Sequence, residues 1–308
     1  MMKDFTNHSK YLNPLTDFGF HKLFGTESCK ELLIDFLNEV ILERGRITDL
    51  EYLPSLHLGK KEKDRKAIFD IYCRNERGEY FIVEMQNAHQ VYFKDRCIYY
   101  STFPVQEQSL RGKDWKFKLA PVYTVAILDF KLFDNHPDYH HEVKLMNFRT
   151  KEVFSDKLTY FFLELPKFDK TLEELTTHFE RWIYLLRYLP KLSDRPVELQ
   201  GRVFDMLFRA AEIAQFTPIE MEKYNKSVLE YSDVRDAVEY ARETGLEEGI
   251  GIGMEKGVKQ GREEGFEKGI ISIVRKCLEK NMPVEDIADL TGLSEEQILK
   301  EKRGKGRD

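Results

Sequence analysis

Two short apolar runs, at residues 67–73 and 80–85, most constrain how this chain can fold. Both runs are rich in β-branched and aromatic residues, and a polar loop that contains Gly78 separates them. Apolar runs of this length around a glycine-containing loop are typical of a β-hairpin. Helical apolar patterns precede the pair at 28–43 and follow it at 91–110, so we predict a sheet with helices packed on it.

Three later apolar runs, at 121–130, 141–148 and 159–165, predict further strands of the same sheet. At the start of the helical pattern over 28–43, Ser28 is predicted to be the N-cap and Glu31 to complete a capping box. We therefore expect residues 1–168 to form one α/β core. Helical patterns then replace the strands, which predicts a helical region over 169–243, either a domain or an extension of the core.

Glycines recur at every fourth position from 245 to 269, and the residue after each glycine is apolar in six of seven cases. A flexible linker is one interpretation, because each glycine inside a helix costs about 1 kcal/mol relative to alanine. Oppositely charged residues four positions apart, such as Glu264 and Lys268, favour a helix. We predict a helical repeat over 244–270 that associates with itself, since small residues at this spacing let two backbones approach closely.

Residues 271–308 predict a small helical module with a helix-turn-helix outline, in which Gly292 lies in the turn. Ser294 and Gln297 have the spacing of a capping box at the start of the last helix. That helix would open with Glu295 and Glu296, which would face phosphates if it read DNA. The alternative is a module for packing or oligomerisation.

The charge balance at first argues against a nucleic-acid-binding protein, because 48 Lys and Arg face 54 Asp and Glu. However, the acidic excess lies in residues 151–248, with 20 acidic against 14 basic residues. Basic clusters at 60–66 and 111–118 fall in the predicted core, where they can meet a phosphate backbone.

The four cysteines are widely scattered and have no paired spacing, which indicates neither a disulfide framework nor a zinc site. The chain has no apolar run of the roughly 18 residues needed to cross a bilayer, and its start lacks the pattern of a signal peptide. A cytoplasmic protein with no membrane partner is the expectation.

Acidic side chains interrupt the predicted hairpin. Glu84 and Gln86 are two residues apart on one strand, so they project from the same face, and Asp70 on the other strand can lie across from them. These acids could lie on an exposed face and pair with nearby Lys and Arg. Alternatively they form a Mg²⁺ site, because a hard cation prefers carboxylate oxygens.

Five ordered motifs carry a resemblance to a known family: TDFGFHKLFG (16–25), LLIDFLNEVI (32–41), AIFDIYC (67–73), YFIVEMQ (80–86) and FKDRCIYY (93–100). Together they resemble the Rpn family of recombination-promoting nucleases, also labelled as transposases, within the PD-(D/E)XK nuclease superfamily. The resemblance covers residues 1–165 well and extends more loosely to the end of the chain.

The resemblance implies a restriction-endonuclease-like α/β fold, with a mixed sheet flanked by helices and followed by an all-α C-terminal region. It also implies hydrolysis of DNA phosphodiesters that depends on Mg²⁺, with Mn²⁺ as a substitute. By position, Asp70 and Glu84 would bind the metal, and Gln86 stands where the wider superfamily has lysine. Because an amide carries no positive charge, the cationic role would fall to Lys22 or Arg96.

Two further residues are secondary candidates for the site: Lys66 as a substrate contact, and Asp17 as an additional acid near the first helix. The leading hypothesis is a Mg²⁺-dependent DNA endonuclease that promotes recombination or serves a mobile element, and that forms a homo-oligomer through the glycine repeat. The alternative is a catalytically weak or inactive nuclease fold that acts as a DNA-binding or assembly factor, which the missing lysine motivates.

Overall fold

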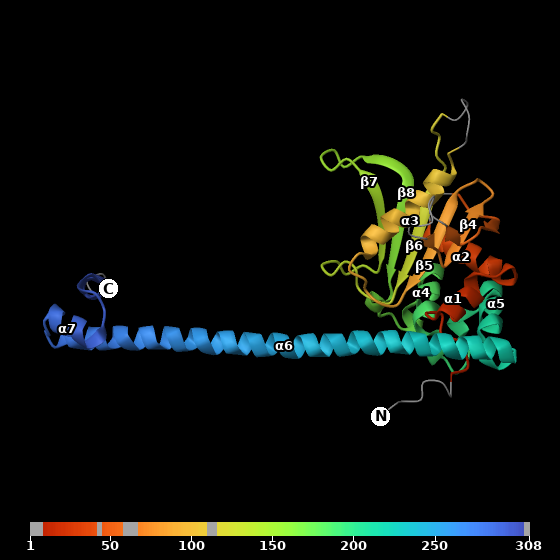
Figure 1. Cartoon of the computed structure of the whole chain (residues 1–308). Coiled ribbons are helices and arrows are strands. Elements are labelled where there is room, and N and C mark those ends of the chain that lie inside the picture. Colours follow the sequence, from red (N-terminus) through yellow and green to blue (C-terminus); the bar gives the residue numbers. More distant parts are fainter. Residues whose placement is uncertain (1–8, 42–44, 58–66, 110–115, 305–308) are drawn as a thin grey trace. The chain divides into compact units, whose positions relative to one another are not determined.

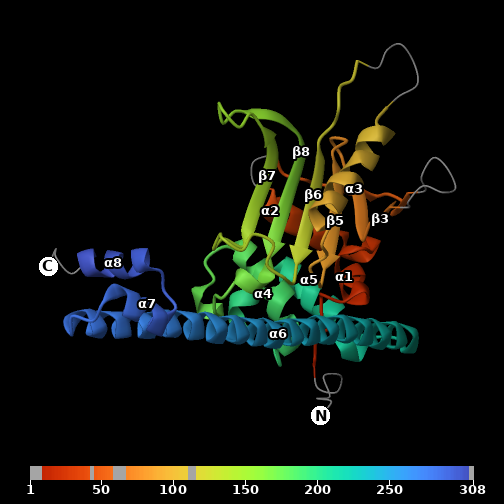
Figure 2. The same cartoon turned by 60° about the vertical axis from the view of Figure 1, so that its left-hand side comes forward.

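The computed structural model of the chain describes residues 9–41, 45–57, 67–109 and 116–304. The chain forms two compact units, residues 1–238 and 239–308. The first unit contains the sheet and most of the helices, and the second is helical (Figures 1 and 2). We describe each unit by itself.

A mixed sheet of six strands forms the centre of the first unit. Its strands, in spatial order, are β1 (Leu50–Tyr52), β4 (Ile71–Asn75), β5 (Tyr80–Gln86), β6 (Val122–Leu128), β8 (Val153–Glu164) and β7 (His140–Met146). The strands β5, β6 and β8 run parallel, so their carboxyl ends meet at one edge of the sheet. A separate pair, β2 (Leu56–His57) and β3 (Ala67–Ile68), is antiparallel.

The predicted hairpin is confirmed as β4 and β5, which pair in antiparallel fashion with Ile71 opposite Val83. Gly78 in the connecting loop has φ +76°, a conformation that favours glycine. The run over 67–73 is not one strand, however, because β3 ends at Ile68 and β4 begins at Ile71. Asp70 therefore lies in the bend between two strands.

Helices cover both faces of the sheet. The helices α1 (Asp17–Phe24), α2 (Lys30–Val40), α4 (His178–Tyr188) and α5 (Arg202–Ala211) contribute to the larger core, together with alternate residues of the strands. The opposite face carries α3 (Phe93–Glu107), whose Phe93 and Cys97 pack on Ala126 and Phe162. Since α3 connects β5 to β6, it is the crossover that parallel pairing requires.

Short 3₁₀-helices complete the first unit. They are η1 (Glu27–Cys29), η2 (Leu165–Lys167), η3 (Leu172–Glu174), η4 (Leu189–Lys191), η5 (Val197–Leu199) and η6 (Ile213–Gln215). The predicted cap at Ser28 is wrong, because Ser28 lies inside η1 and α2 begins at Lys30 with Cys29 as its N-cap. Glu31 makes an ion pair with Arg202 of α5 instead of closing a capping box.

The helices α4 and α5, which follow residue 169, share their core with the sheet. Trp182 of α4 is fully buried and contacts the rings of Phe24 and Phe36 from α1 and α2. The compact unit accordingly extends to residue 238, well beyond the strands.

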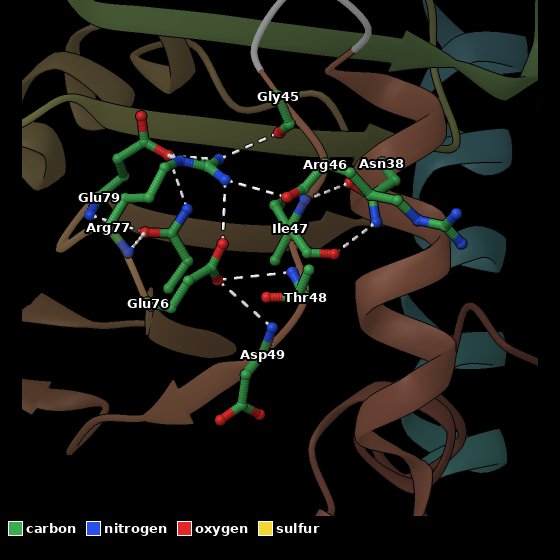
Figure 3. A network of polar contacts seen from close by, with 10 residues as sticks. Asn38, Gly45, Arg46, Ile47, Thr48, Asp49, Glu76, Arg77 and Glu79 are labelled. Carbon is green, nitrogen blue, oxygen red and sulfur yellow. Dashed lines mark hydrogen bonds and ion pairs between the residues drawn. The ribbon is translucent and has the colours of Figure 1, made fainter.

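A network of polar contacts joins the end of α2 and the following segment to the β4–β5 loop (Figure 3). The Arg77 guanidinium donates to the carbonyls of Gly45 and Arg46, at 3.2 and 3.0 Å. The Asn38 amide donates to the Ile47 carbonyl and accepts from its N–H, at 3.0 and 2.8 Å. These contacts hold the hairpin against α2.

In the described part of the chain, the edge strand β7 pairs with β8 alone, and its register is irregular between Lys144 and Met146. Lys144 also makes an ion pair with Glu142 of the same strand.

The helix α6 (Pro218–Glu279) begins in the first unit and continues into the second, where α7 (Val284–Thr291) and α8 (Glu295–Gly304) follow. The glycine repeat lies inside α6, so the predicted helix is confirmed. Val274, Ile287 and Ile298 form a small core among the three helices. Among the described residues, no helix is long and apolar enough to cross a membrane.

The cap of the last helix is also confirmed. The Ser294 hydroxyl accepts from the Gln297 N–H, and the Gln297 amide oxygen accepts from the Ser294 N–H at 3.0 Å. Gly292 ends α7 with φ +71°, in the left-handed region.

Candidate active site

The hairpin brings Asp70 and Glu84 into contact. The Asp70 N–H donates to Glu84 Oε1 at 3.4 Å, and the Met85 N–H donates to Asp70 Oδ2 at 2.8 Å. This arrangement follows from the register, because the pairing of Ile71 with Val83 places the preceding Asp70 opposite Glu84. The predicted adjacency of the two carboxylates is confirmed, and their role stays a prediction.

Gln86 lies beside Glu84 on the same face of β5. Its Nε2 donates to Glu84 Oε2 at 3.4 Å, as the period of two along a strand predicts. Their common neighbour Met85 packs into the larger core on the other face. Glu84 and Gln86 therefore point toward the side of the sheet that α3 covers.

The two carboxylates lack enough positive charge to offset their burial. Glu84 is only 4% exposed, and this burial together with the nearby Asp70 charge raises its pKa well above the usual value. Asp70 keeps an exposed surface, but dense protein around its carboxylate raises its pKa to about 6, against the hydrogen bond from Met85. Such a pair is stabilised when a cation neutralises it.

Among the described residues, Arg96 of α3 is a cation whose charge acts on both carboxylates. Its guanidinium lowers the pKa of both Asp70 and Glu84, although less than burial raises them. It lies over the rings of Phe93 and Tyr100, at 5.4 and 5.7 Å. Nη1 donates to the Gln90 side chain, whereas the buried Nη2 has no hydrogen-bond partner within the described residues.

A third acid lies close to the pair. Asp17 is the first residue of α1, and its charge contributes to the raised pKa of Asp70. The pKa of Asp17 itself is raised, first by burial and then by the charge of Glu230 on α6. The site thus combines the hairpin, the start of α1 and the first turns of α3.

Comparison with known families identifies the family of the chain. The model of a family described as PD-(D/E)XK nuclease family transposases matches residues 14–241. The chain belongs to this family. The match agrees with the resemblance carried by the five motifs, and it includes α4, α5 and the first part of α6. No curated protein matches the chain, and neither does any solved structure.

As expected for a PD-(D/E)XK family member, a restriction-endonuclease-like α/β core carries the site. The structure does not bring Lys22 to the two carboxylates. Its ammonium makes an ion pair with Glu220 at the start of α6 and lies 5.3 Å from the Phe216 ring centre. Lys66 lies outside the described residues, so Arg96 is the predicted cation that the structure places at the site.

The donor set of this candidate site fits a hard divalent cation. Asp70 and Glu84 offer carboxylate oxygens, and Gln86 adds an amide oxygen nearby. In the part of the chain that the structure describes, no group of three or more His, Cys, Asp and Glu could hold a metal. Two carboxylates suit Mg²⁺, which retains several waters, better than zinc, which needs three or four protein ligands.

Sequence analysis missed two residues at the edge of the site, Asp129 and Tyr231. Asp129 directly follows β6, and its N–H donates to the Gln86 carbonyl at 2.9 Å. The Tyr231 hydroxyl of α6 donates to Asp129 Oδ2 at 2.9 Å. An acid near the end of the apolar run over 121–130 was the available signal for Asp129.

Proposed function

We propose that this chain is a Mg²⁺-dependent endonuclease that hydrolyses DNA phosphodiester bonds, in recombination or in the service of a mobile element. The observation that carries the proposal is the contact between Asp70 and Glu84 beside the unpartnered Nη2 of Arg96. The family match supports a nuclease, and the chemistry of the pair supports a divalent metal.

Each residue has a separate role in this proposal. Asp70 and Glu84 would hold Mg²⁺, which would supply activation of a water and neutralisation of phosphate charge. The Gln86 amide would orient a water on the same face of β5. Arg96 would supply positive charge beside the two carboxylates, where phosphate charge develops, and so fill the cationic role that glutamine cannot.

DNA is the proposed substrate, and a second copy of the chain is the proposed partner. The exposed Lys116 and Lys118 belong to the basic cluster that precedes β6. In α6, five of the six apolar residues that follow the glycines are 61–72% exposed: Leu246, Ile250, Met254, Val258 and Phe266. The glycines of this segment have open space where a Cβ would lie, which leaves room for a closely approaching helix.

Incubation of the purified full chain with supercoiled plasmid and Mg²⁺ or Mn²⁺ tests the proposed activity. We expect the wild type to nick or linearise the plasmid, EDTA to stop the reaction, and Asp70→Asn to be inactive. Equal cleavage by the wild type and Asp70→Asn would refute the site assignment. Failure of the wild type to cleave with either metal would refute the activity.

One observation favours a second candidate, a catalytically weak DNA-binding or assembly factor. Gln86 occupies the usual lysine position, and Lys22 is held by Glu220. A protein that binds plasmid DNA under these conditions without cutting it would support this candidate.

Replacement of Arg96 tests the cationic role. We expect Arg96→Met to lower kcat/KM by about 100-fold, the effect of removing one donor aimed at developing charge. Steady-state cleavage of a labelled duplex measures it. Lys94→Met is the matched control, because it removes the same charge from an exposed position of α3 where the ammonium lies over Phe133. Equal losses in both variants would assign the effect to general charge rather than to Arg96.

A further inference from the structure

The first third of α6 passes along the site and contacts three parts of the unit. The Tyr224 hydroxyl accepts from the Asn13 N–H at 2.9 Å, and the buried Ser227 hydroxyl accepts from the Phe18 N–H at 3.0 Å. These two contacts dock α6 on the start of α1. One turn later, Tyr231 reaches the carboxyl edge of the sheet, where it donates to Asp129.

Three hydrogen bonds then lead from Tyr231 to Glu84. After the Tyr231 contact at 2.9 Å, the Asp129 N–H donates to the Gln86 carbonyl at 2.9 Å. The Gln86 side chain in turn donates to Glu84 Oε2 at 3.4 Å. Tyr231 is 102 residues from Asp129 in the sequence, so the connection exists only in the folded chain.

The end of β5 depends on this connection. Gln86 is the last residue of the strand and pairs with Leu128, the last residue of β6. Asp129 adds the final backbone contact to Gln86 as the chain leaves β6. Arg235 holds the Tyr231 side chain from the next turn of α6, with its guanidinium carbon 5.7 Å from the ring centre. Tyr231 therefore holds the Asp129 carboxylate at the end of β6.

We propose that Tyr231 is a positioning residue of the active site, which acts through Asp129 to fix Gln86 and Glu84. It does not touch substrate. The proposal rests on the proposed nuclease function for its activity readout, and on metal binding for a second readout. Displacement of catalytic groups by about 1 Å can lower a rate by about 100-fold, and loss of a group that orients a metal ligand weakens metal binding by about 10–100-fold.

The full-length variants Tyr231→Phe and Tyr224→Phe form a matched pair, because each removes one hydroxyl from the same helix. We expect Tyr231→Phe to lower kcat by about tenfold with the KM for DNA unchanged. It should also raise, by several fold, the Mn²⁺ concentration that gives half of the maximal increase in Tm. Tyr224→Phe should lower the Tm without either effect, because its hydroxyl accepts from the Asn13 N–H, in the segment before α1.

Variants of Asp129 test whether Tyr231 acts on Gln86 and Glu84 through this residue. Asp129→Asn keeps an oxygen that accepts from Tyr231, so we expect near wild-type kcat, whereas Asp129→Ala should resemble Tyr231→Phe. The double variant Tyr231→Phe with Asp129→Ala should be no worse than Asp129→Ala alone, since both changes break one connection.

Several results would overturn the proposal. One such result is a Tyr231→Phe protein with the kcat and the Mn²⁺ response of the wild type. Another is an equal loss of kcat in Tyr231→Phe and Tyr224→Phe, which would show that Tyr231 only helps to dock α6. If the wild type does not cleave DNA, the proposed activity fails. The Mn²⁺ titrations then still decide whether Tyr231 positions the metal ligands.

Discussion

Glu84→Gln is expected to abolish metal-dependent cleavage and, in the absence of metal, to make the protein more stable. Cleavage should fall by more than about 100-fold, the upper range for residues that only support a metal ligand. Stability should rise because the change removes a buried charge that lies against Asp70. Plasmid cleavage and thermal unfolding in EDTA measure the two effects.

Glu51→Gln is the control, because Glu51 is an exposed acid on the same sheet that pairs with Arg74. Its cleavage rate should stay near that of the wild type. A Glu84→Gln protein that still cleaves, or that unfolds at a lower temperature in EDTA, would contradict the assignment of Glu84 as a buried, uncompensated acid.

The same pair predicts how stability depends on pH. An acid whose pKa is raised by folding binds its proton more tightly in the folded state, so the free energy of unfolding falls as pH rises. For Asp70, the pH range of this loss begins near its ordinary pKa of 3.8 and ends above its raised pKa of about 6. For Glu84, the range begins near 4.5 and extends to higher pH. Metal-free wild type should therefore lose more stability than Glu84→Gln between about pH 4 and pH 8.

The comparison with Glu84→Gln is needed because His178 also makes the free energy of unfolding fall as pH rises. Asp35 raises the pKa of His178, and this contribution is present below 6.5 and lost as pH rises through the raised value. It is common to both proteins and cancels in the difference. Parallel stability curves would refute the pH prediction.

Trp182→Ala has the second large expected effect, a loss of about 3–5 kcal/mol in the free energy of unfolding. Trp182 is fully buried among the rings of Phe24, Phe36 and Phe204, and its Nε1 donates to Asp35 at 2.8 Å. Denaturant unfolding followed by circular dichroism gives the measurement. Because α4 shares the core of the sheet, signals from helices and strands should shift together.

Val197→Ala is the control, since Val197 is exposed in η5 and its loss should change stability by less than about 0.5 kcal/mol. A Trp182→Ala protein in which the sheet unfolds at the wild-type denaturant concentration would show that α4 is an independent part of the chain.

Local patterns in the sequence were sufficient for the centre of the site. The period of two along a strand places Glu84 and Gln86 on one face, and the hairpin places Asp70 across from them. Helical spacing likewise predicted α2 and the glycine-rich part of α6. These features depend on neighbours in the sequence, so a single chain suffices to predict them.

Contacts between distant segments could not be predicted in this way. Lys22 lies in one of the motifs that carry the family resemblance, but its partner Glu220 is 198 residues away. The contact of Tyr231 with Asp129 has no sequence pattern because it depends on how α6 packs against the sheet. The prediction of Ser28 as the N-cap was wrong for a local reason. Ser28 lies within the 3₁₀-helix η1, so α2 begins only after it.

The two outer strands of the sheet bear on how the protein behaves when concentrated. An open strand edge can pair with the edge of another molecule and start an aggregate. At one side β1 is only three residues long, which limits such pairing. At the other side the irregular register and the charges of Glu142 and Lys144 make β7 a poor template, so non-specific growth of the sheet is disfavoured at both ends.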